Sequence, residues 1–486
     1  DNVLVSVYGV AWIAGLYALA GATGQSAALL LVTGFVVPFL FWCAMIGFVV
    51  YVHHTHTSVS WHAERVAWGR AQPFVSTTVH LTFPARIGAL MHHIMEHTAH
   101  HVDMSVPLYR LKTAQKKLEE LPVEIHRDAA GNLWTTLRGE SPKELLIGGH
   151  IDSVPNGGWL DGCLNVVAGI EILRRIHAQY NGKPPVTVRL VDWADEEGAR
   201  FGKSLFGSSA CSGNLDMNEA RGLVDKQGIK LPDALKNVGI DFERVKDSGK
   251  ELKNAAAYIE LHIEQGPVLL DLDLPLGAVL GTFGVERHAI TFHGQAAHSG
   301  STPMNRRKDA FLAAAKMSSE IYKIAERSGN GVCTIGSCTT KPGIVTSVVE
   351  ECRITLDQRH LDAAKLATML AEAKAASEQF AKEGKVKVSW ERLWQIAPRP
   401  FNNDLINLCD ESIRETCGKS HRLPSGPLHD AAEVAAAGVP TVMMFVQSLH
   451  GISHNKIEDT KEEHLELCVT AFDKLAEKAM GWIGQR

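Results

Sequence analysis

The opening segment of the chain is almost entirely apolar. Between Asp1 and Glu64 it contains no Asp, Glu, Lys or Arg, and two apolar runs, residues 3–20 and 27–52, are separated by a short linker that contains Gly and Ser. A membrane-spanning helix needs roughly 20 apolar residues. The pattern therefore predicts an N-terminal transmembrane helical hairpin, with two buried helices of a soluble domain as the alternative.

Basic residues follow the second apolar run, at Arg65, Arg70 and Arg86. Cytoplasmic loops next to membrane spans carry an excess of Lys and Arg. We therefore expect the downstream part of the chain to be cytoplasmic, and to be attached to the cytoplasmic face of a membrane through residues 3–52.

From about residue 121 the pattern changes to short strand-like runs that alternate with helical stretches. The runs at residues 144–149, 186–191 and 257–262 are apolar and rich in strand-forming residues, whereas residues 166–177 have helical spacing. Such alternation predicts an α/β fold in which helices pack on a central mixed sheet. Residues 277–390 read differently, as strand, helix, strand, strand, helix, strand, which predicts an inserted α+β domain.

Composition and charge narrow the class of protein. A length of 486 residues is enough for two to four domains. The net charge of -5 comes without a basic stripe, which argues against a nucleic-acid partner. The nine cysteines include no C-x-x-C pair, which argues against a thiolate zinc site and suits a reducing compartment.

Histidines gather after the apolar runs. One segment reads HHTH and a later one reads EHTAHH, in which His97, His100 and His101 lie on neighbouring faces of a helix, a spacing suited to iron or zinc. Residues 1–115 resemble the C-terminal part of the membrane fatty-acid desaturases. That family builds its di-iron centre from three histidine boxes, of which only the third has a counterpart here. The resemblance therefore implies a desaturase-like segment without desaturase activity.

Polar clusters follow the predicted strands, at the strand ends where ligands gather in α/β folds. His150 and Asp152 face the same way on an extended segment. Asp152 can therefore accept the second ring N–H of a metal-bound His150 and fix its tautomer. Asp161 follows closely in sequence, and its carboxylate can bridge two ions.

The later clusters add carboxylates and imidazoles. Residues 192–198 contain four carboxylates, which would repel one another without a cation. The segment follows an apolar strand and precedes a glycine, which is the pattern of a metal ligand paired with a general base, with a solvated acidic turn as the alternative. A later strand ends with His262, and the loop after another apolar run carries His454.

Together these clusters resemble the aminoacylase/carboxypeptidase-type co-catalytic zinc peptidase family. Within it they are most similar to the branch of N-carbamoyl-L-amino-acid hydrolases, ureidopropionases and allantoate amidohydrolases. The resemblance covers about residues 118–484 and is carried by the motifs DAAGN, GGHIDSVPNGGWLDG, DEEGARFGKSLFGS, LHIEQGP and AAHSGSTPM. His262 marks the branch, because peptidases of the wider family usually have a carboxylate there.

The resemblance implies a metal-dependent hydrolase that cleaves a linear amide or ureido C–N bond in a small molecule, an N-carbamoyl-L-amino acid or a related ureido or N-acyl amino acid. It implies two divalent metal ions per subunit, zinc first, with manganese, cobalt or nickel as alternatives. Asp161 would bridge the ions, and the implied ligands are His150, Asp161, Glu197, His262 and His454. The implied catalytic residues are the general base Glu196, together with Asp152 and His298.

The remaining implied roles fall on later motifs. His298 would stabilise the developing oxyanion, in the active site of the partner subunit. Arg359 would hold a substrate carboxylate through two hydrogen bonds, and Gln265 would bind the ureido or amide group. Thr346 stands at a substrate-binding position where relatives often carry Asn. As alternatives, Arg359 is a surface cation on a strand and His298 is a turn residue.

These observations predict four segments along the chain. Residues 1–115 form the desaturase-like membrane segment, residues 118–276 and 393–486 form the two parts of the catalytic domain, and residues 277–392 form an inserted dimerisation or lid domain. The inserted domain implies a homodimer. The alternative functions are a membrane lipid desaturase fragment or fusion, and an inactive membrane-tethered protein.

Overall fold

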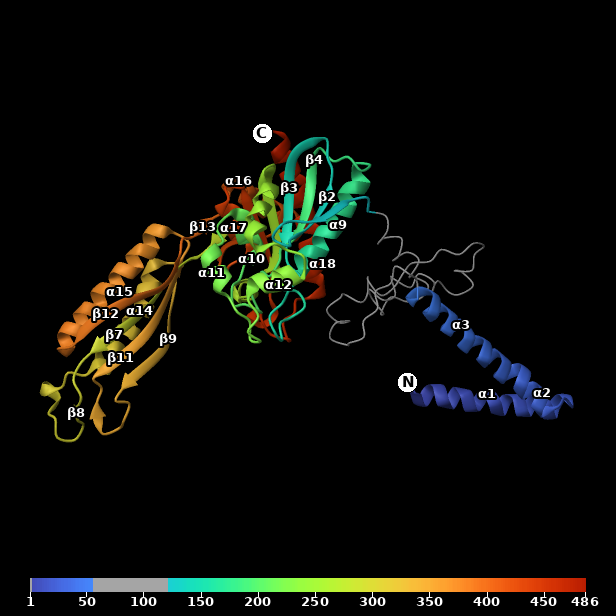
Figure 1. The fold of residues 1–486 in the computed structure, drawn as a ribbon, viewed down its shortest axis with the longest axis horizontal. Coiled ribbons are helices and arrows are strands. Elements are labelled where there is room, and N and C mark those ends of the chain that lie inside the picture. Colours follow the sequence, from blue (N-terminus) through green and yellow to red (C-terminus); the bar gives the residue numbers. More distant parts are fainter. Residues whose placement is uncertain (1, 56–120) are drawn as a thin grey trace. The chain divides into compact units, whose positions relative to one another are not determined.

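The computed structural model describes residues 2–55 and 121–486 (Figure 1). The chain divides into two compact units, Asp1–Leu121 and Pro122–Arg486. The predicted cluster of His97, His100 and His101 lies outside the described residues.

The described part of the first unit contains the two apolar runs, and each of them is helical. Trp12 donates its indole N–H to the carbonyl oxygen of Gly34 at 3.1 Å, and a Cβ added to Gly34 would lie 2.8 Å from a methyl carbon of Leu16. Glycine therefore permits the close approach of the two rods. Its helices are α1 (Asn2–Thr23), α2 (Ala27–Leu31), the π-helical turn η1 (Val32–Val36) and α3 (Val37–His54).

The linker between the apolar runs is shorter than the expected residues 21–26, because α1 continues to Thr23 and Ser26 caps α2. Within the described residues, Ala27–Met45 is the stretch that is long and apolar enough to cross a bilayer. Val7–Thr23 is a shorter apolar helix. Helical rods thus form over both runs, and one of the two has the length of a membrane span.

The second unit is built around a nine-stranded sheet with the order β1-β2-β4-β3-β5-β15-β6-β13, in which β14 also pairs with β6. The neighbours β4, β3, β5 and β15 are parallel, whereas β1, β2, β6 and β13 join by antiparallel pairs. The expected central mixed sheet is therefore confirmed. Its strands are β1 (Glu124–Arg127), β2 (Leu133–Leu137), β3 (Ser141–Gly149), β4 (Val186–Asp192), β5 (Ala255–Ile263), β6 (Leu276–Thr282), β13 (Arg399–Pro400), β14 (His421–Ser425) and β15 (Thr441–Val446).

Helices pack against this sheet and bury its central strands. The parallel strands are buried along most of their length, which is typical of strands covered on both faces; residues 145–149 of β3 and all of β15 are buried. Helices α9 and α18 contact β3, β4 and β5, and α17 contacts β5 and β15. The helical elements are α9 (Cys163–Gln179), α10 (Phe206–Ser212), α11 (Met217–Gly222), α12 (Leu231–Asn237), η2 (Phe242–Leu252), α13 (Val268–Asp271), α16 (Asn403–Cys417), α17 (Asp430–Ala436), η4 (Leu449–Gly451) and α18 (Glu462–Gly484).

A separate four-stranded antiparallel sheet has the order β12-β7-β11-β9 (Figure 1). Alternate residues of β11 are buried, and they share an apolar core with α14 and α15. Because β6 pairs with the central sheet, this smaller sheet begins at Gly284. Its region contains β7 (Gly284–His293), β8 (Ala297–His298), η3 (Met304–Arg306), α14 (Ala310–Ser328), β9 (Val332–Lys341), β10 (Ser347–Val348), β11 (Glu351–His360), α15 (Ala363–Gly384) and β12 (Lys387–Ile396).

Candidate active site

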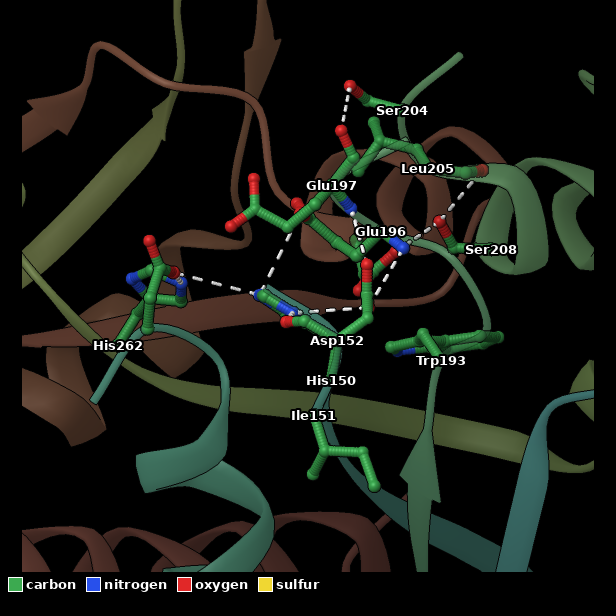
Figure 2. A network of polar contacts seen from close by, with 12 residues as sticks. His150, Ile151, Asp152, Trp193, Glu196, Glu197, Ser204, Leu205, Ser208 and His262 are labelled. Atoms are coloured by element: carbon green, nitrogen blue, oxygen red, sulfur yellow. Dashed lines mark hydrogen bonds and ion pairs between the residues drawn. The ribbon is translucent and has the colours of Figure 1, made fainter. Parts of the chain in front are cut away.

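The polar clusters converge at one edge of the central sheet. His150 directly follows β3, the segment with Glu196 and Glu197 follows β4, and His262 is the second-last residue of β5. Because β3, β4 and β5 are parallel, their carboxyl ends meet at the same edge. Figure 2 shows these side chains pointing toward one another.

One group of side chains contains His150, Asp161 and His262. Their ligand atoms all lie within 4.8 Å of one another, and all three residues are buried. His262 Nε2 lies 3.0 Å from Asp161 Oδ1, and His150 Nε2 lies 3.7 Å from the same oxygen. The buried His150 Nε2 has no hydrogen-bond partner, and a metal ion is the kind of partner that such a nitrogen fits.

A second group contains Asp161, Glu197 and His454, again with ligand atoms within 4.8 Å of one another. His454 Nε2 lies 3.5 Å from Asp161 Oδ2 and 3.3 Å from Glu197 Oε2. Glu197 Oε1 is buried without a hydrogen-bond partner. The two groups share Asp161: its Oδ1 faces the first group and its Oδ2 faces the second. The structure therefore brings all five predicted ligands together around one shared carboxylate.

A glycine allows the first group to close. Gly162 follows Asp161 and has a φ of 65°, a conformation that L side chains rarely adopt. A Cβ added there would lie 2.3 Å from His150 Nε2. The backbone that carries Asp161 can therefore approach His150 only because residue 162 has no side chain.

Asp152 links the first two clusters of the sequence. Its carboxylate oxygens accept the backbone N–H groups of Glu196 at 3.2 Å and Glu197 at 3.1 Å. The same side chain lies 3.4 Å from His150 Nδ1, and its backbone carbonyl lies 3.0 Å from that nitrogen. Asp152 thus orients both the imidazole and the acidic turn, as the sequence suggested for the imidazole.

Glu196 lies in the crowded centre of the site. Its Oε2 is 3.7 Å from His150 Nε2, and its residue surface is 8% exposed. Burial raises the pKa of Glu196 to about 8, although the neighbouring His150 and His262 oppose the shift. Burial also raises the pKa of Asp161, but the hydrogen bond and charge of His262 outweigh it, so the pKa falls below its usual range. Added positive charge would favour the ionised form of both carboxyl groups.

A cavity of about 520 Å³ opens onto these groups. In its wall, Arg359 donates to Asp357 from Nε at 2.8 Å and to the carbonyl of Gly426 at 2.9 Å. Arg287 donates to the other oxygen of Asp357 at 2.6 Å. Two guanidinium groups on one carboxylate give this local Arg-Asp-Arg group a net positive charge. The functional side chains that line the cavity are Asp161, Glu196, Glu197, His262, Gln265, Arg287, Arg359, Trp394, His429 and His454.

Gln265 reaches into the metal-ligand cluster. Its Nε2 donates to Asp161 Oδ2 at 2.8 Å and to Ser453 Oγ at 3.1 Å, and its Oε1 is buried without a partner. In this structure the amide nitrogen of Gln265 is therefore bonded to Asp161, while its oxygen stays available to a donor in the cavity.

His298 and Thr346 lie near each other but are not among the described residues that line this cavity. His298 ends β8, which pairs with β10, and Ser299 N donates to the Thr346 carbonyl at 3.0 Å. His298 Nδ1 accepts the N–H groups of Gly300 and Ser301. The structure therefore brings together these two predicted residues, without bringing them to the ligand groups of the same chain.

Two buried residues of the site were not predicted from the sequence. The His429 ring lies 4.4 Å from the His262 ring, and burial, aided by His262, lowers its pKa well below the usual range. Glu458 accepts the backbone N–H of Asp161 at 3.1 Å. Neither residue belongs to a motif with distinctive spacing: His429 is followed by Asp at the start of a helix, and Glu458 lies four residues after His454. Only their proximity to other motifs in the sequence could have indicated them.

The DAAGN motif, residues 128–132, forms hydrogen bonds to the segments on either side of the acidic turn. Asp128 accepts the N–H groups of Ala130 and Asn132, an Asp-centred turn. Asn132 in turn accepts the N–H of Ala194 at 3.0 Å and donates to the carbonyl of Gly207 at 3.3 Å. These bonds hold both ends of the loop that contains Glu196.

Comparison with known proteins supports these observations. Residues 146–478 match the model of "Peptidase family M20/M25/M40". The chain belongs to this family. It is 36% identical over 359 residues to an N-carbamoyl-L-amino acid amidohydrolase of Geobacillus stearothermophilus, covering 71% of this chain and 85% of that one. It is 32% identical over 349 residues to an allantoate amidohydrolase of Escherichia coli (strain K12), covering 71% and 84%.

Solved structures agree with the sequence relatives. An amidase of the hydantoinase/carbamoylase family from Burkholderia multivorans superposes with a TM-score of 0.66 at 27% identity, covering 75% of this chain and 90% of that one. The family and branch read from the motifs are thus confirmed. Residues 2–128 match the fatty acid desaturase family model, which extends past the predicted end at residue 115 and includes β1.

Proposed function

We propose that this chain is a dinuclear metal-dependent amidohydrolase that cleaves the linear C–N bond of an N-carbamoyl-L-amino acid. The observation that carries the proposal is the pair of ligand groups that share Asp161, with the Glu196 carboxylate beside them. Divalent cations held by the two groups would polarise a substrate carbonyl and lower the pKa of water. The orphaned His150 Nε2 and Glu197 Oε1 fit such ions.

The residues around this centre have different proposed roles. His150, His262 and Asp161 would hold one cation, and Glu197, His454 and Asp161 would hold the other. Glu196 takes a proton from the attacking water and delivers it to the leaving nitrogen. Asp152 holds the backbone of the acidic turn, so that Glu196 keeps its place when it gains or loses that proton.

Arg359 is the proposed site for the substrate carboxylate. Asp357 and the Gly426 carbonyl fix the plane of its guanidinium group and leave N–H groups of the outer nitrogens available. A planar guanidinium with paired donors suits a carboxylate. Because Arg287 also donates to Asp357, the local group of Arg359, Asp357 and Arg287 has a net positive charge, which supports an anionic substrate group at Arg359. The buried Oε1 of Gln265 would accept an N–H of the ureido group.

A neighbouring cavity of about 1140 Å³ favours substrates with an apolar side chain. It shares Gln265, Arg287 and Arg359 with the metal-facing cavity. A substrate whose carboxylate lies at Arg359 can therefore extend its side chain into this space, where burial of apolar surface contributes about 25 cal/mol per Å². The apolar residues in its lining are Val268, Phe283, Val332, Leu356, Leu393, Leu423 and Phe445.

We further propose a homodimer in which His298 and Thr346 complete the site of the partner subunit. Their distance from the ligand groups of their own chain supports this arrangement, since neither lines the described cavity. The apolar rods α1 to α3 would attach the enzyme to the cytoplasmic face of a membrane, for which the span-length helix Ala27–Met45 is the support.

The full chain, purified in detergent, tests this function directly. Metal-depleted protein would be reloaded with zinc, manganese, cobalt or nickel and assayed for ammonia release from N-carbamoyl amino acids and allantoate. We expect turnover with at least one metal, a preference for large apolar side chains, and a loss of about 10²–10⁴ in kcat for Glu196→Gln. The exposed Glu466→Gln is the matched control. If no metal gives turnover of any substrate, the proposal is wrong.

A further inference from the structure

Glu458 is a buried carboxylate that no metal-ligand group includes. It is 2% exposed and lies four residues after His454. One oxygen accepts the backbone N–H groups of Leu160 at 3.3 Å and Asp161 at 3.1 Å, almost 300 positions earlier in the chain. Glu458 thus joins the backbone of the segment that carries Asp161 to the segment that carries His454.

The Asp161 segment is shaped around this carboxylate. A Cβ added to Gly158 would lie 2.3 Å from Glu458 Oε1 and 2.4 Å from its Cβ. A side chain at residue 158 would therefore displace Glu458. The backbone of residues 158–161 approaches the carboxylate as closely as glycine permits, which is the geometry of a built contact.

The second oxygen of Glu458 reaches the carboxylate of Asp161 through a hydroxyl group. Ser453 Oγ donates to Glu458 Oε2 at 2.9 Å and lies 3.1 Å from Asp161 Oδ2. Asp161 Oδ2 also accepts from Gln265 Nε2. This is the oxygen that faces His454, so the network surrounds the half of Asp161 that belongs to the second ligand group.

The two ligand groups differ in how they are held. His150 and His262 are buried at the ends of strands, and a strand fixes their positions without Glu458. His454 lies in a loop, has a φ of 55°, and its side chain is 52% exposed. The second group therefore depends on loop contacts, and Glu458 supplies a buried one.

We propose that Glu458 is a positioning residue for the second cation, the one held by Asp161, Glu197 and His454. It fixes the position of Asp161 relative to the loop that carries His454, so that the second group is preorganised for metal binding. This inference rests on the proposed function, because it needs both groups to bind metal. Contacts of this kind change metal affinity by about 10–100-fold.

Cobalt binding to the metal-depleted full chain tests the proposal. Titration with Co²⁺ against a competing chelator gives the affinity of each equivalent, and the visible absorption of Co²⁺ reports its coordination geometry. We expect two equivalents in the wild type. In Glu458→Ala the second equivalent should bind about 10–100-fold more weakly with an altered spectrum. The first equivalent should weaken much less, because the buried His150 and His262 also hold it.

Two further variants control for folding. Glu458→Gln keeps one acceptor oxygen for the two backbone N–H groups, so its second equivalent should bind with intermediate affinity; it also carries the test if Glu458→Ala does not fold. Exposed Glu466→Ala should bind both equivalents as the wild type does. Wild-type affinity for both ions in Glu458→Ala or Glu458→Gln, or equal weakening of both, overturns the proposal. Fewer than two equivalents in the wild type contradicts the dinuclear function itself.

Discussion

Replacing Gly162 with Ala should damage the metal site more than the fold. The added Cβ would lie 2.3 Å from Nε2 of His150 and 2.4 Å from two ring carbons. Since carbon atoms prefer a separation of about 3.5 Å, the imidazole or the Asp161 backbone must move by about 1 Å. His150 is 2% exposed, so little free space is open to it.

The size of the effect has two parts. A residue other than glycine with a φ of 65° costs about 1–3 kcal/mol of folding free energy. A displacement of about 1 Å in a catalytic group costs about 10²-fold in rate. We therefore expect Gly162→Ala to lose about 1–3 kcal/mol in the free energy of unfolding, about 10²-fold in kcat/KM, and affinity for the cation held by His150.

Gly213→Ala is the control that separates the cost of the positive φ from the cost of the steric clash with His150. Gly213 has a φ of 85°, and a Cβ added there would have no atom within 4 Å. This variant should lose similar stability in urea unfolding but keep metal affinity and kcat/KM. If Gly162→Ala binds two equivalents of metal with wild-type affinity and retains kcat/KM within about threefold, the argument from the His150 contact is refuted.

Three further predictions concern the substrate, the acidic loop and the cations. Arg359→Ala should lower kcat/KM about 10–100-fold for N-carbamoyl amino acids, because a charged hydrogen bond contributes about 1.5–3 kcal/mol. It should not lower kcat/KM for the same substrates with an amidated carboxyl group. Equal losses on both substrates would exclude the carboxylate contact. Asn132→Ala leaves the part-buried N–H of Ala194 without its side-chain acceptor. It should cost about 1 kcal/mol in urea unfolding and reduce kcat; an unchanged kcat would show that the loop does not need this contact. Chelation should abolish ammonia release and lower the Tm, because the buried carboxylates would lose their counter-charges, whereas an unchanged Tm would argue against ions bound at these groups.

Much of the site could be read from the sequence because its ligands follow strands. His150, Glu197 and His262 stand at or near the ends of β3, β4 and β5, and these strands are recognisable as apolar runs. The carboxyl ends of parallel strands meet at one edge. The local pattern therefore indicated which side chains converge, and the motifs that surround them indicated the family.

The order of the strands and the partners of each side chain could not be read in the same way. Apolar runs identify β6, but they do not tell that it pairs with β15 and β14 of the central sheet instead of with the smaller sheet. Pairing depends on which surfaces are left to be buried after the other elements have packed, and that is a property of the whole fold.

The sequence by itself thus indicated the α/β pattern, the apolar helices, and the candidate metal ligands and general base. Only the tertiary structure showed that Asp161 directs one oxygen to each ligand group and that residue 162 must lack a side chain for His150 to fit. It also showed that Glu458 accepts the backbone N–H of Asp161, almost 300 positions earlier in the sequence. The physical reason is the sequence separation over which each kind of interaction acts. Periodicity and turn chemistry act over a few residues, whereas these contacts arise when separate loops are packed against one another.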